Sequence, residues 1–255
     1  MSFILSTRSE LLKTKRSASV WLTVLGALFI PGIFLLMYLS RPDIFVTQLT
    51  FNPWRQHFLR GWQSVSAFLF PMFVILICTF IPQIEYKNNT WKQVYASPQS
   101  IGTIFFSKMV TIHLMILFCF LLFNIFMIGS ALVTNLINPH YSFLKSKIDI
   151  GFLLKLNLKT YISVLGISAI QYWLSLRLKN FIAPIGIGLA LLITALILLQ
   201  WKHIYKIPYA HPILTLLSYK GRNRPFLENH ELNSIGYFIA FTVIGFLDMK
   251  YRTAD

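Results

Sequence analysis

Six stretches of this sequence contain no Asp, Glu, Lys or Arg and approach or reach the length needed to cross a lipid bilayer as helices. A hydrocarbon core of roughly 30 Å requires about 20 apolar helical residues, because each backbone N–H and C=O must find its partner within the segment. The stretches are residues 19–39, 63–84, 109–133, 160–176, 180–200 and 232–247. They predict an all-α, polytopic integral membrane protein with six transmembrane helices in a single domain, residues 1–255.

The composition agrees with a membrane protein and excludes an ordinary soluble domain. Hydrophobic residues make up 56% of the chain and charged residues 12%, and the mean hydropathy is +0.63. A soluble domain with this balance would lack polar surface. The first stretch follows a basic segment, as in a signal peptide, but it is too long for a signal-peptide core and has no small-residue cleavage site before Arg41. We therefore expect an uncleaved first span.

The net charge of +15 comes from 23 basic and 8 acidic residues, and the basic residues are scattered over every loop. Scattered Lys and Arg at the ends of spans are typical of contact with lipid phosphates, so we expect the lipid bilayer, and no nucleic acid, as their partner. The basic residues divide almost evenly between the two sides. The four that precede the first span favour a cytoplasmic N-terminus and, with six spans, a cytoplasmic C-terminus.

The three longest segments between spans are residues 40–62, 134–159 and 201–231. Each mixes apolar with polar or basic residues, and in the last two the apolar residues alternate with lysines and arginines, which favours interfacial helices lying on the outer membrane surface. Trp21, Trp62 and Trp201 stand at the ends of predicted spans, where indole rings are expected among the lipid headgroups.

No catalytic motif is present: the chain has no phosphate-binding loop sequence and no metalloprotease or serine-hydrolase signature. Cys78 and Cys119 fall within spans and are expected to be packing residues. Asn124 and Gln171 are amides within spans, where they could bond neighbouring helices together or line a polar translocation path. Gly186 and Ala190 are spaced for close helix packing.

The short loop after the second span contains helix-forming and aromatic residues. It begins with Glu85 and continues as YKNNTWKQVYASP through residue 98. Thr90 could cap a short helix and Pro98 could end it. Trp91 and Tyr95 would then share one face of that helix, with Val94 beside them. Either this aromatic face contacts a partner, or the helix only rests on lipid.

These residues resemble the cytoplasmic loop of ABC transporter permeases of the type-2 exporter class. The similarity lies in Glu85 at the inner end of the second span, the segment KNNTWK, Pro98 with Ser100, and Lys108 opening the third span. The phrase SELLKTKRS at residues 9–17, the six spans and the basic C-terminal tail are also similar. The chain is most similar to permeases of the lantibiotic-immunity and bacitracin-type group.

The resemblance implies an N-terminal amphipathic helix over about residues 5–16, with its charged residues Glu10, Lys13, Lys15 and Arg16, and a coupling helix over about residues 85–97. It implies that Trp91, Val94 and Tyr95 enter a groove of a separate ABC ATPase subunit and that Glu85, Lys87 and Lys92 make polar contacts around them. ATP and magnesium would bind in that subunit, with no cofactor in this chain. A second permease, the same chain or a different one, would complete a plasma-membrane exporter of an amphipathic peptide, an antibiotic or a lipid.

Two other functions remain open on the residues alone. A secondary carrier or channel would require ionisable residues at mid-membrane, and the spans offer only His113, close to a span end. An accessory membrane anchor would have the same spans but would not depend on Trp91. An enzyme acting on lipid is less well supported, because no nucleophile, base or metal cluster can be assembled.

Overall fold

The computed structural model describes residues 3–15, 17–49, 52–219 and 225–252. Within these residues the chain is helical and contains no strand, which confirms the all-α prediction. Five helices are long and apolar enough to cross a membrane: α2 (Ala18–Ser40), α5 (Leu69–Lys87), α7 (Ile101–Ile137), α8 (Ile150–Arg177) and α11 (Asn229–Arg252).

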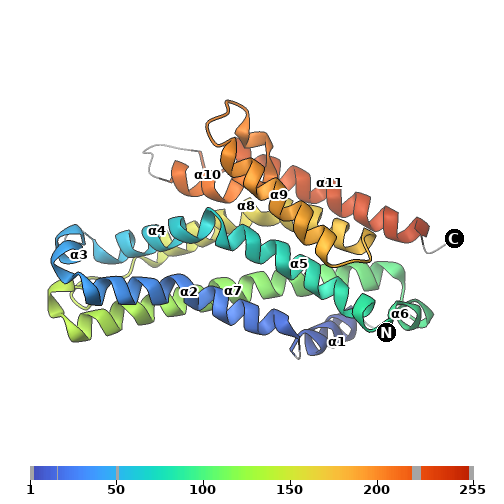
Figure 1. Ribbon diagram of the computed structural model, residues 1–255, viewed down its shortest axis with the longest axis horizontal. Helices are drawn as coiled ribbons and strands as arrows, with labels where there is room; N and C mark the ends of the chain where they lie inside the picture. The colour runs from blue at the N-terminus through green and yellow to red at the C-terminus, as the bar shows by residue number, and fades with distance from the viewer. Residues whose placement is uncertain (1–2, 16, 50–51, 220–224, 253–255) are drawn as a thin grey trace.

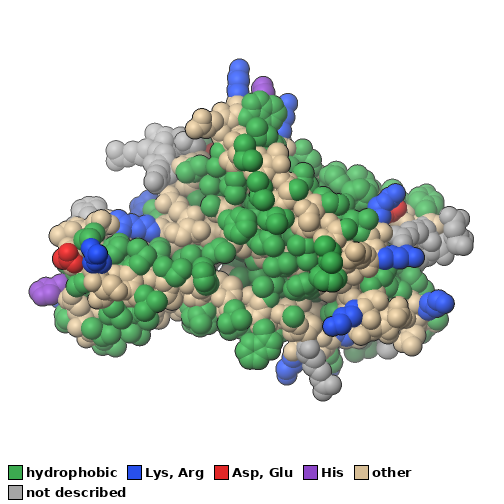
Figure 2. Space-filling view, viewed as in Figure 1, with side chains coloured by type: hydrophobic (Ala, Val, Ile, Leu, Met, Phe, Trp, Pro, Cys, Tyr) green, Lys and Arg blue, Asp and Glu red, His purple; other side chains and the backbone are tan. Residues whose placement is uncertain are grey.

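A sixth apolar helix, α9 (Ile182–Ile197), has 16 residues. At 1.5 Å per residue such a helix is roughly 24 Å long, a little shorter than the hydrocarbon core. The predicted count of six spans is therefore consistent with the structure when α9 is included. Hydrophobic side chains cover the middle of the molecule, and charged side chains gather at its ends and at the tip beyond α9 (Figure 2).

The chain passes back and forth along the long axis of the molecule (Figure 1). The described chain ends lie at the same end as α1 (Phe3–Lys15) and α6 (Trp91–Ala96). The opposite end holds α3 (Pro42–Gln48) and the connection between α7 and α8, which includes the short turn η1 (Pro139–Tyr141). The two ends of the chain thus share one side of the predicted membrane; that this side is the cytoplasm stays a prediction.

The predicted second span, residues 63–84, is interrupted in the structure. Its first residues belong to α4 (Pro53–Ser66), and the helix breaks at Phe68 before α5 begins. Trp62 is 1% exposed and packs against Phe120 and Phe123 with ring centroids 4.7 Å apart. The prediction that Trp62 lies among headgroups is therefore wrong, because α4 turns its aromatic face into the core, whereas Trp21 and Trp201 are exposed.

Residues 134–159 do not form a separate surface α-helix. The third span continues to Ile137 and the fourth begins at Ile150, so much of residues 134–159 extends α7 and α8. In the connection, Phe143 is buried and its carbonyl accepts a hydrogen bond from Trp54 Nε1 at 2.9 Å. Aromatic packing therefore holds Phe143 inside the protein, while its neighbour Leu144 is exposed.

Residues 201–219 fold back onto the protein. They form η2 (Ile204–Lys206), η3 (Pro208–Ala210) and α10 (His211–Ser218), and α10 packs on α8. Lys159 and Glu231 are both buried, and Lys159 Nζ donates to the two carboxylate oxygens of Glu231 at 3.0 and 3.1 Å. Mutual neutralisation allows these charges to be buried between α8 and α11.

The closest helix packing involves small residues, but not all of those predicted. Gly166 of α8 donates its N–H to Ser234 Oγ of α11 at 3.0 Å, so these two helices approach closely. On α9 the tight position is Gly188, where a Cβ atom would lie 2.7 Å from Gln171 Oε1. Gly186 has nothing within 4 Å of such an atom, so the predicted role of Gly186 in packing is wrong. Gly186 and Gly188 lie on different faces of α9.

Candidate coupling site around α1 and α6

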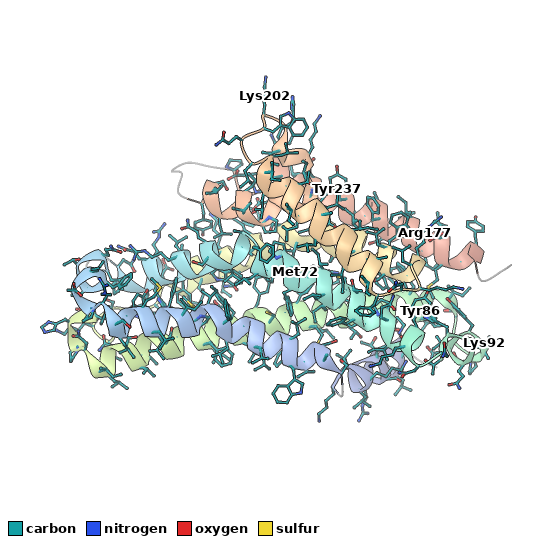
Figure 3. The ribbon with its side chains drawn as sticks, viewed as in Figure 1. Met72, Tyr86, Lys92, Arg177, Lys202 and Tyr237 are labelled. Atoms are coloured by element: carbon teal, nitrogen blue, oxygen red, sulfur yellow. The ribbon has the colours of Figure 1, made fainter. Side chains whose placement is uncertain are left out.

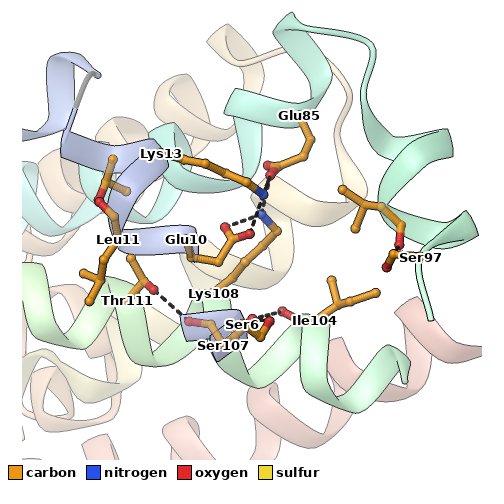
Figure 4. A network of polar contacts seen from close by, with 12 residues as sticks. Ser6, Glu10, Leu11, Lys13, Glu85, Ser97, Ile104, Ser107, Lys108 and Thr111 are labelled. Carbon is orange, nitrogen blue, oxygen red and sulfur yellow. Dashed lines mark hydrogen bonds and ion pairs between the residues drawn. The ribbon is translucent and has the colours of Figure 1, made fainter. Parts of the chain in front are cut away.

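A buried network of four charged side chains joins α1, α5 and α7 (Figure 4). Lys108 Nζ lies 2.7 Å from Glu10 Oε2 and 2.7 Å from Glu85 Oε1. Lys13 Nζ lies 2.6 Å from Glu10 Oε1 and 3.0 Å from Glu85 Oε1. Each lysine therefore contacts both carboxylates, and three helices from distant parts of the sequence meet at this point. We call Glu10, Lys13, Glu85 and Lys108 the ionic network.

The ionic network is well shielded from solvent. The side chains of Lys108 and Glu85 are 0% and 1% exposed, and only Lys13, at 36%, reaches the surface to a substantial degree. Burying a single ion costs several kcal/mol, which is tolerable only when opposite charges and hydrogen bonds compensate it. Two carboxylates and two ammonium groups provide that compensation, so the removal of one member leaves an unbalanced charge.

The pKa values of the two α1 members change in the directions that ion pairing requires. Burial acts to raise the pKa of Glu10, but the nearby charges of Lys108 and Lys13 outweigh it and hold this pKa below its usual value of 4.5. Burial acts to lower the pKa of Lys13, and its contacts with Glu10 and Glu85 instead raise this pKa above 10.5. Both groups are therefore charged near neutral pH.

Helix α1 is amphipathic, as predicted, but it turns its polar face inward. Ser6, Glu10 and Thr14 are buried at a spacing of four residues and form a stripe towards α7. Ser6 Oγ donates to Ser107 Oγ at 3.1 Å, while several apolar residues of α1 are exposed. This arrangement suits a helix at a membrane surface, whose apolar face meets lipid. Lys15 is exposed, and Arg16 lies outside the described residues.

The predicted helix over residues 85–97 is shorter in the structure, because residues 85–87 complete α5 and only Trp91–Ala96 form α6. Asn89, with φ of 53°, makes the turn between the two helices. Thr90 precedes α6 but makes no capping hydrogen bond with its side chain, contrary to the prediction. Ser97 is extended, and α6 therefore ends just before Pro98, as predicted.

Trp91 connects α6 to the ionic network. Its ring stacks on Tyr95 at 5.3 Å and contacts Tyr86 at 5.2 Å. Lys108 Nζ lies 5.6 Å from the centre of the Trp91 ring, within the range of a cation–π contact. The buried Trp91 Nε1 has no hydrogen-bond partner in the part of the chain that the structure describes. The inner face of the Trp91 ring is therefore packed against the protein, and its indole N–H makes no hydrogen bond to the described residues.

The outer side of α6 is accessible. Tyr95 is 43% exposed, Lys92 is exposed and Val94 is half-buried. Tyr86 and Lys92 lie at the same end of the molecule, far from Lys202 (Figure 3). Beside α6 is a hollow of about 280 Å³. It is lined by Tyr86, Trp91, Tyr95, Leu176, Lys179, Asp248 and Met249. An exposed ring next to a hollow is a shape into which a partner side chain can pack.

The residues predicted to make polar contacts around α6 differ in their exposure to solvent. Lys87 and Lys92 are exposed, whereas Glu85 is buried within the ionic network. A direct polar contact between Glu85 and a partner disagrees with this burial, because its carboxylate is directed at two lysines of its own chain. Glu85, Lys108 and α1 are far apart along the chain, so their meeting could not be predicted from local sequence patterns.

The two amides considered for a translocation path both join helices. Asn124 Nδ2 donates to Asn157 Oδ1 at 2.7 Å, between α7 and α8. Gln171 is fully buried, donates to the Pro184 carbonyl at 2.6 Å and accepts from Tyr209 Oη at 3.2 Å. These contacts favour a structural role for both amides, most strongly for Gln171. Asn157 was not singled out from the sequence, although it lies beside the predicted fourth span.

Comparison with known proteins adds one finding. A family described as ABC-2 family transporter protein matches residues 7–195, which include α1, the ionic network and α6. Searches of curated proteins and of solved structures found no significant match to the chain. The family match extends over well more than half of the sequence, from the first turns of α1 to the end of α9. The chain therefore belongs to the ABC-2 family of transporter proteins.

Proposed function

We propose that this ABC-2 permease is the membrane subunit of an ATP-driven exporter and that a separate ABC ATPase docks on α6. The observation that carries the proposal is the link from the exposed side of α6, through Trp91 and Lys108, to the ionic network and α1. ATP and magnesium bind in the ATPase, which supplies the energy, and this chain supplies the transmembrane path. The complex lies in the plasma membrane, with both chain termini in the cytoplasm.

A docking surface on α6 would combine an aromatic anchor with charged surroundings. Tyr95 and the exposed edge of the hollow beside it provide the anchor, and Lys87 and Lys92 provide polar contacts around it. Glu85 acts behind this surface, by fixing Lys108 under the Trp91 ring. The buried Trp91 Nε1 is free to donate to an acceptor of the partner if α6 shifts on docking.

Movement of α6 would reach the spans through rigid contacts. A push on α6 acts on Trp91, and through Lys108 on α7, α5 and α1. A hollow of about 370 Å³ between α1 and α6 leaves space for such a shift. Because the ionic network holds three helices together, they move as a unit, and the ATPase thus biases the permease between conformations.

An apolar groove between the spans supports the proposed class of substrate. A groove of about 300 Å³ opens between α2, the α4–α5 break and α7, and its walls are almost entirely apolar. It includes Trp62, Phe70, Phe73, Phe120 and Phe123. Such walls suit an amphipathic peptide, as in lantibiotic immunity and bacitracin-type export, or another lipophilic antibiotic or a lipid. A second permease, identical or different, would pack against exposed apolar helix faces such as that of α11.

The test is co-purification of the permease with the ABC ATPase encoded beside it. Trp91→Ala with Tyr95→Ala should reduce recovery of the ATPase at least tenfold, because the exposed Tyr95 ring and the Trp91 ring stacked on it are both lost. Tyr95→Ala alone removes an exposed ring without disturbing the core and should give a smaller loss. Lys202→Ala, at the tip beyond α9, serves as the control. Equal recovery with all variants, each verified as folded, would favour an accessory anchor and refute docking on α6.

A further inference from the structure

A second site lies beside the ionic network and shares Tyr86 and Lys179 with the hollow beside α6. It is a groove of about 850 Å³ between the α1–α2 connection and the ends of α5 and α9. Figure 1 shows α2 and α9 on either side of α5, and both helices pack on it. The volume falls within the range of about 300–1,000 Å³ that small-molecule sites usually have.

The groove has a basic rim. Lys13, Lys87 and Lys179 line it, and none of the described residues that line it is acidic. Lys13 already contacts Glu10 and Glu85, but neither Lys87 nor Lys179 has an ion-pair partner among the described residues. Two uncompensated ammonium groups at one opening attract an anion, and most strongly next to a membrane that contains acidic lipids.

Further polar groups at the rim also favour a bound anion. The first residues of α2 and the residues just before α9 line the groove, so two helix N-termini, with their partly positive ends, lie at its wall. Ser19, also a lining residue, is buried, and its Oγ has no hydrogen-bond partner in the described part of the chain. Asn88 at the rim is exposed and can donate from its side-chain amide.

The remaining wall is apolar and continues towards the spans. Leu12, Phe80, Ile84 and Phe181 line it, and the exposed Leu12 and Phe181 lie at the level where the membrane surface is expected. An anion held only by the lysines would leave this apolar surface uncovered, and apolar surface is more stable when it is removed from water. A molecule with a negatively charged head and hydrocarbon tails satisfies both parts of the groove.

We propose that this groove binds an anionic phospholipid, with its phosphate between Lys87 and Lys179 and its acyl chains along Leu12, Phe80 and Phe181. The lipid would bridge α1 and α2 on one side with α5 and α9 on the other. Bound there, it holds the start of α2 against the ends of α5 and α9. Lys87 is shared with the proposed docking surface, so the lipid site is tested on the permease without the ATPase.

The test uses the purified permease in a neutral detergent with added lipid. Phosphatidylglycerol should raise the melting temperature and be retained in native mass spectrometry, and phosphatidylcholine should do so at least tenfold more weakly. Lys87→Gln with Lys179→Gln should abolish the difference between the two lipids. Lys92→Gln, an exposed lysine at the same end but outside the groove, should preserve it.

Three results would overturn the proposal. Equal effects of the two lipids would remove the role of the charge. Equal stabilisation by glycerol phosphate, which has no acyl chains, would remove the role of the apolar wall. An unchanged preference for phosphatidylglycerol in the double variant, verified as folded, would place the lipid elsewhere on the protein.

Discussion

Replacement of Lys108 by Met should destabilise the protein more than any change at an exposed lysine. Met keeps the apolar stem but removes the ammonium group that lies 2.7 Å from each of two buried carboxylates. Breaking a buried ion pair in this way typically costs about 3–5 kcal/mol. Because Lys13 still contacts both carboxylates, the imbalance is a single negative charge, and we expect about 3 kcal/mol.

A second substitution tests whether charge balance is the cause. Adding Glu85→Gln to Lys108→Met leaves Glu10 and Lys13 as a neutral pair 2.6 Å apart. The double variant should therefore recover about 1–2 kcal/mol relative to Lys108→Met alone, within the range of couplings measured for residues in contact. Recovery upon a second substitution in the core cannot arise from lost packing.

The assay is reversible unfolding in mixed micelles as a denaturing detergent is added. Lys87→Met, which removes an exposed lysine two residues after Glu85, is the matched control and should change the free energy of unfolding by less than about 0.5 kcal/mol. If Lys108→Met costs less than about 1 kcal/mol, or if the double variant is less stable than the single one, charge compensation is not what holds α1, α5 and α7 together.

Two further predictions concern helix packing and pH. Gly188→Ala should destabilise the protein by about 1–3 kcal/mol in the same assay, because the added methyl would lie 2.7 Å from Gln171 Oε1. Gly186→Ala, two residues earlier and in open space, should be neutral, and equal effects would contradict the packing of α9. The lowered pKa of Glu10 means that its contribution to stability is full above about pH 4.5 and is lost as the pH falls through the folded-state value. Glu10→Gln should flatten this acid-side loss, and an unchanged pH profile would assign the loss to other groups.

The sequence was sufficient for the class of fold, since in a bilayer only helices of sufficient length satisfy the backbone of an uncharged apolar segment. Length and charge alone do not indicate where a helix breaks. The α4–α5 break lies inside an uncharged stretch, a few residues after Trp62, which packs on Phe120 and Phe123 of a distant helix. Contacts with a distant helix cannot be deduced from the local sequence.

The candidate site was predicted in part. Trp91 and Tyr95 were identified from their spacing, and the structure places them together on α6. The ionic network was not predicted, because its lysine–carboxylate contacts join residues 10, 85 and 108, and a charged residue at the end of a span is usually exposed to headgroups. Glu85 is consequently buried, whereas the resemblance implied that it contacts the ATPase directly.

The exposure of α6 to a cytoplasmic ATPase is the central claim, and site-specific photo-crosslinking tests it most directly. A photoreactive amino acid placed at Lys92, exposed on α6, should form a crosslink to an ABC ATPase that co-purifies with the permease when both are expressed in cells. The same amino acid at Leu144, an exposed residue of the α7–α8 connection, should form none, because this connection lies at the end of the molecule opposite to α6 (Figure 1). A crosslink from residue 144, or none from residue 92 in cells where the two proteins co-purify, would contradict docking on α6.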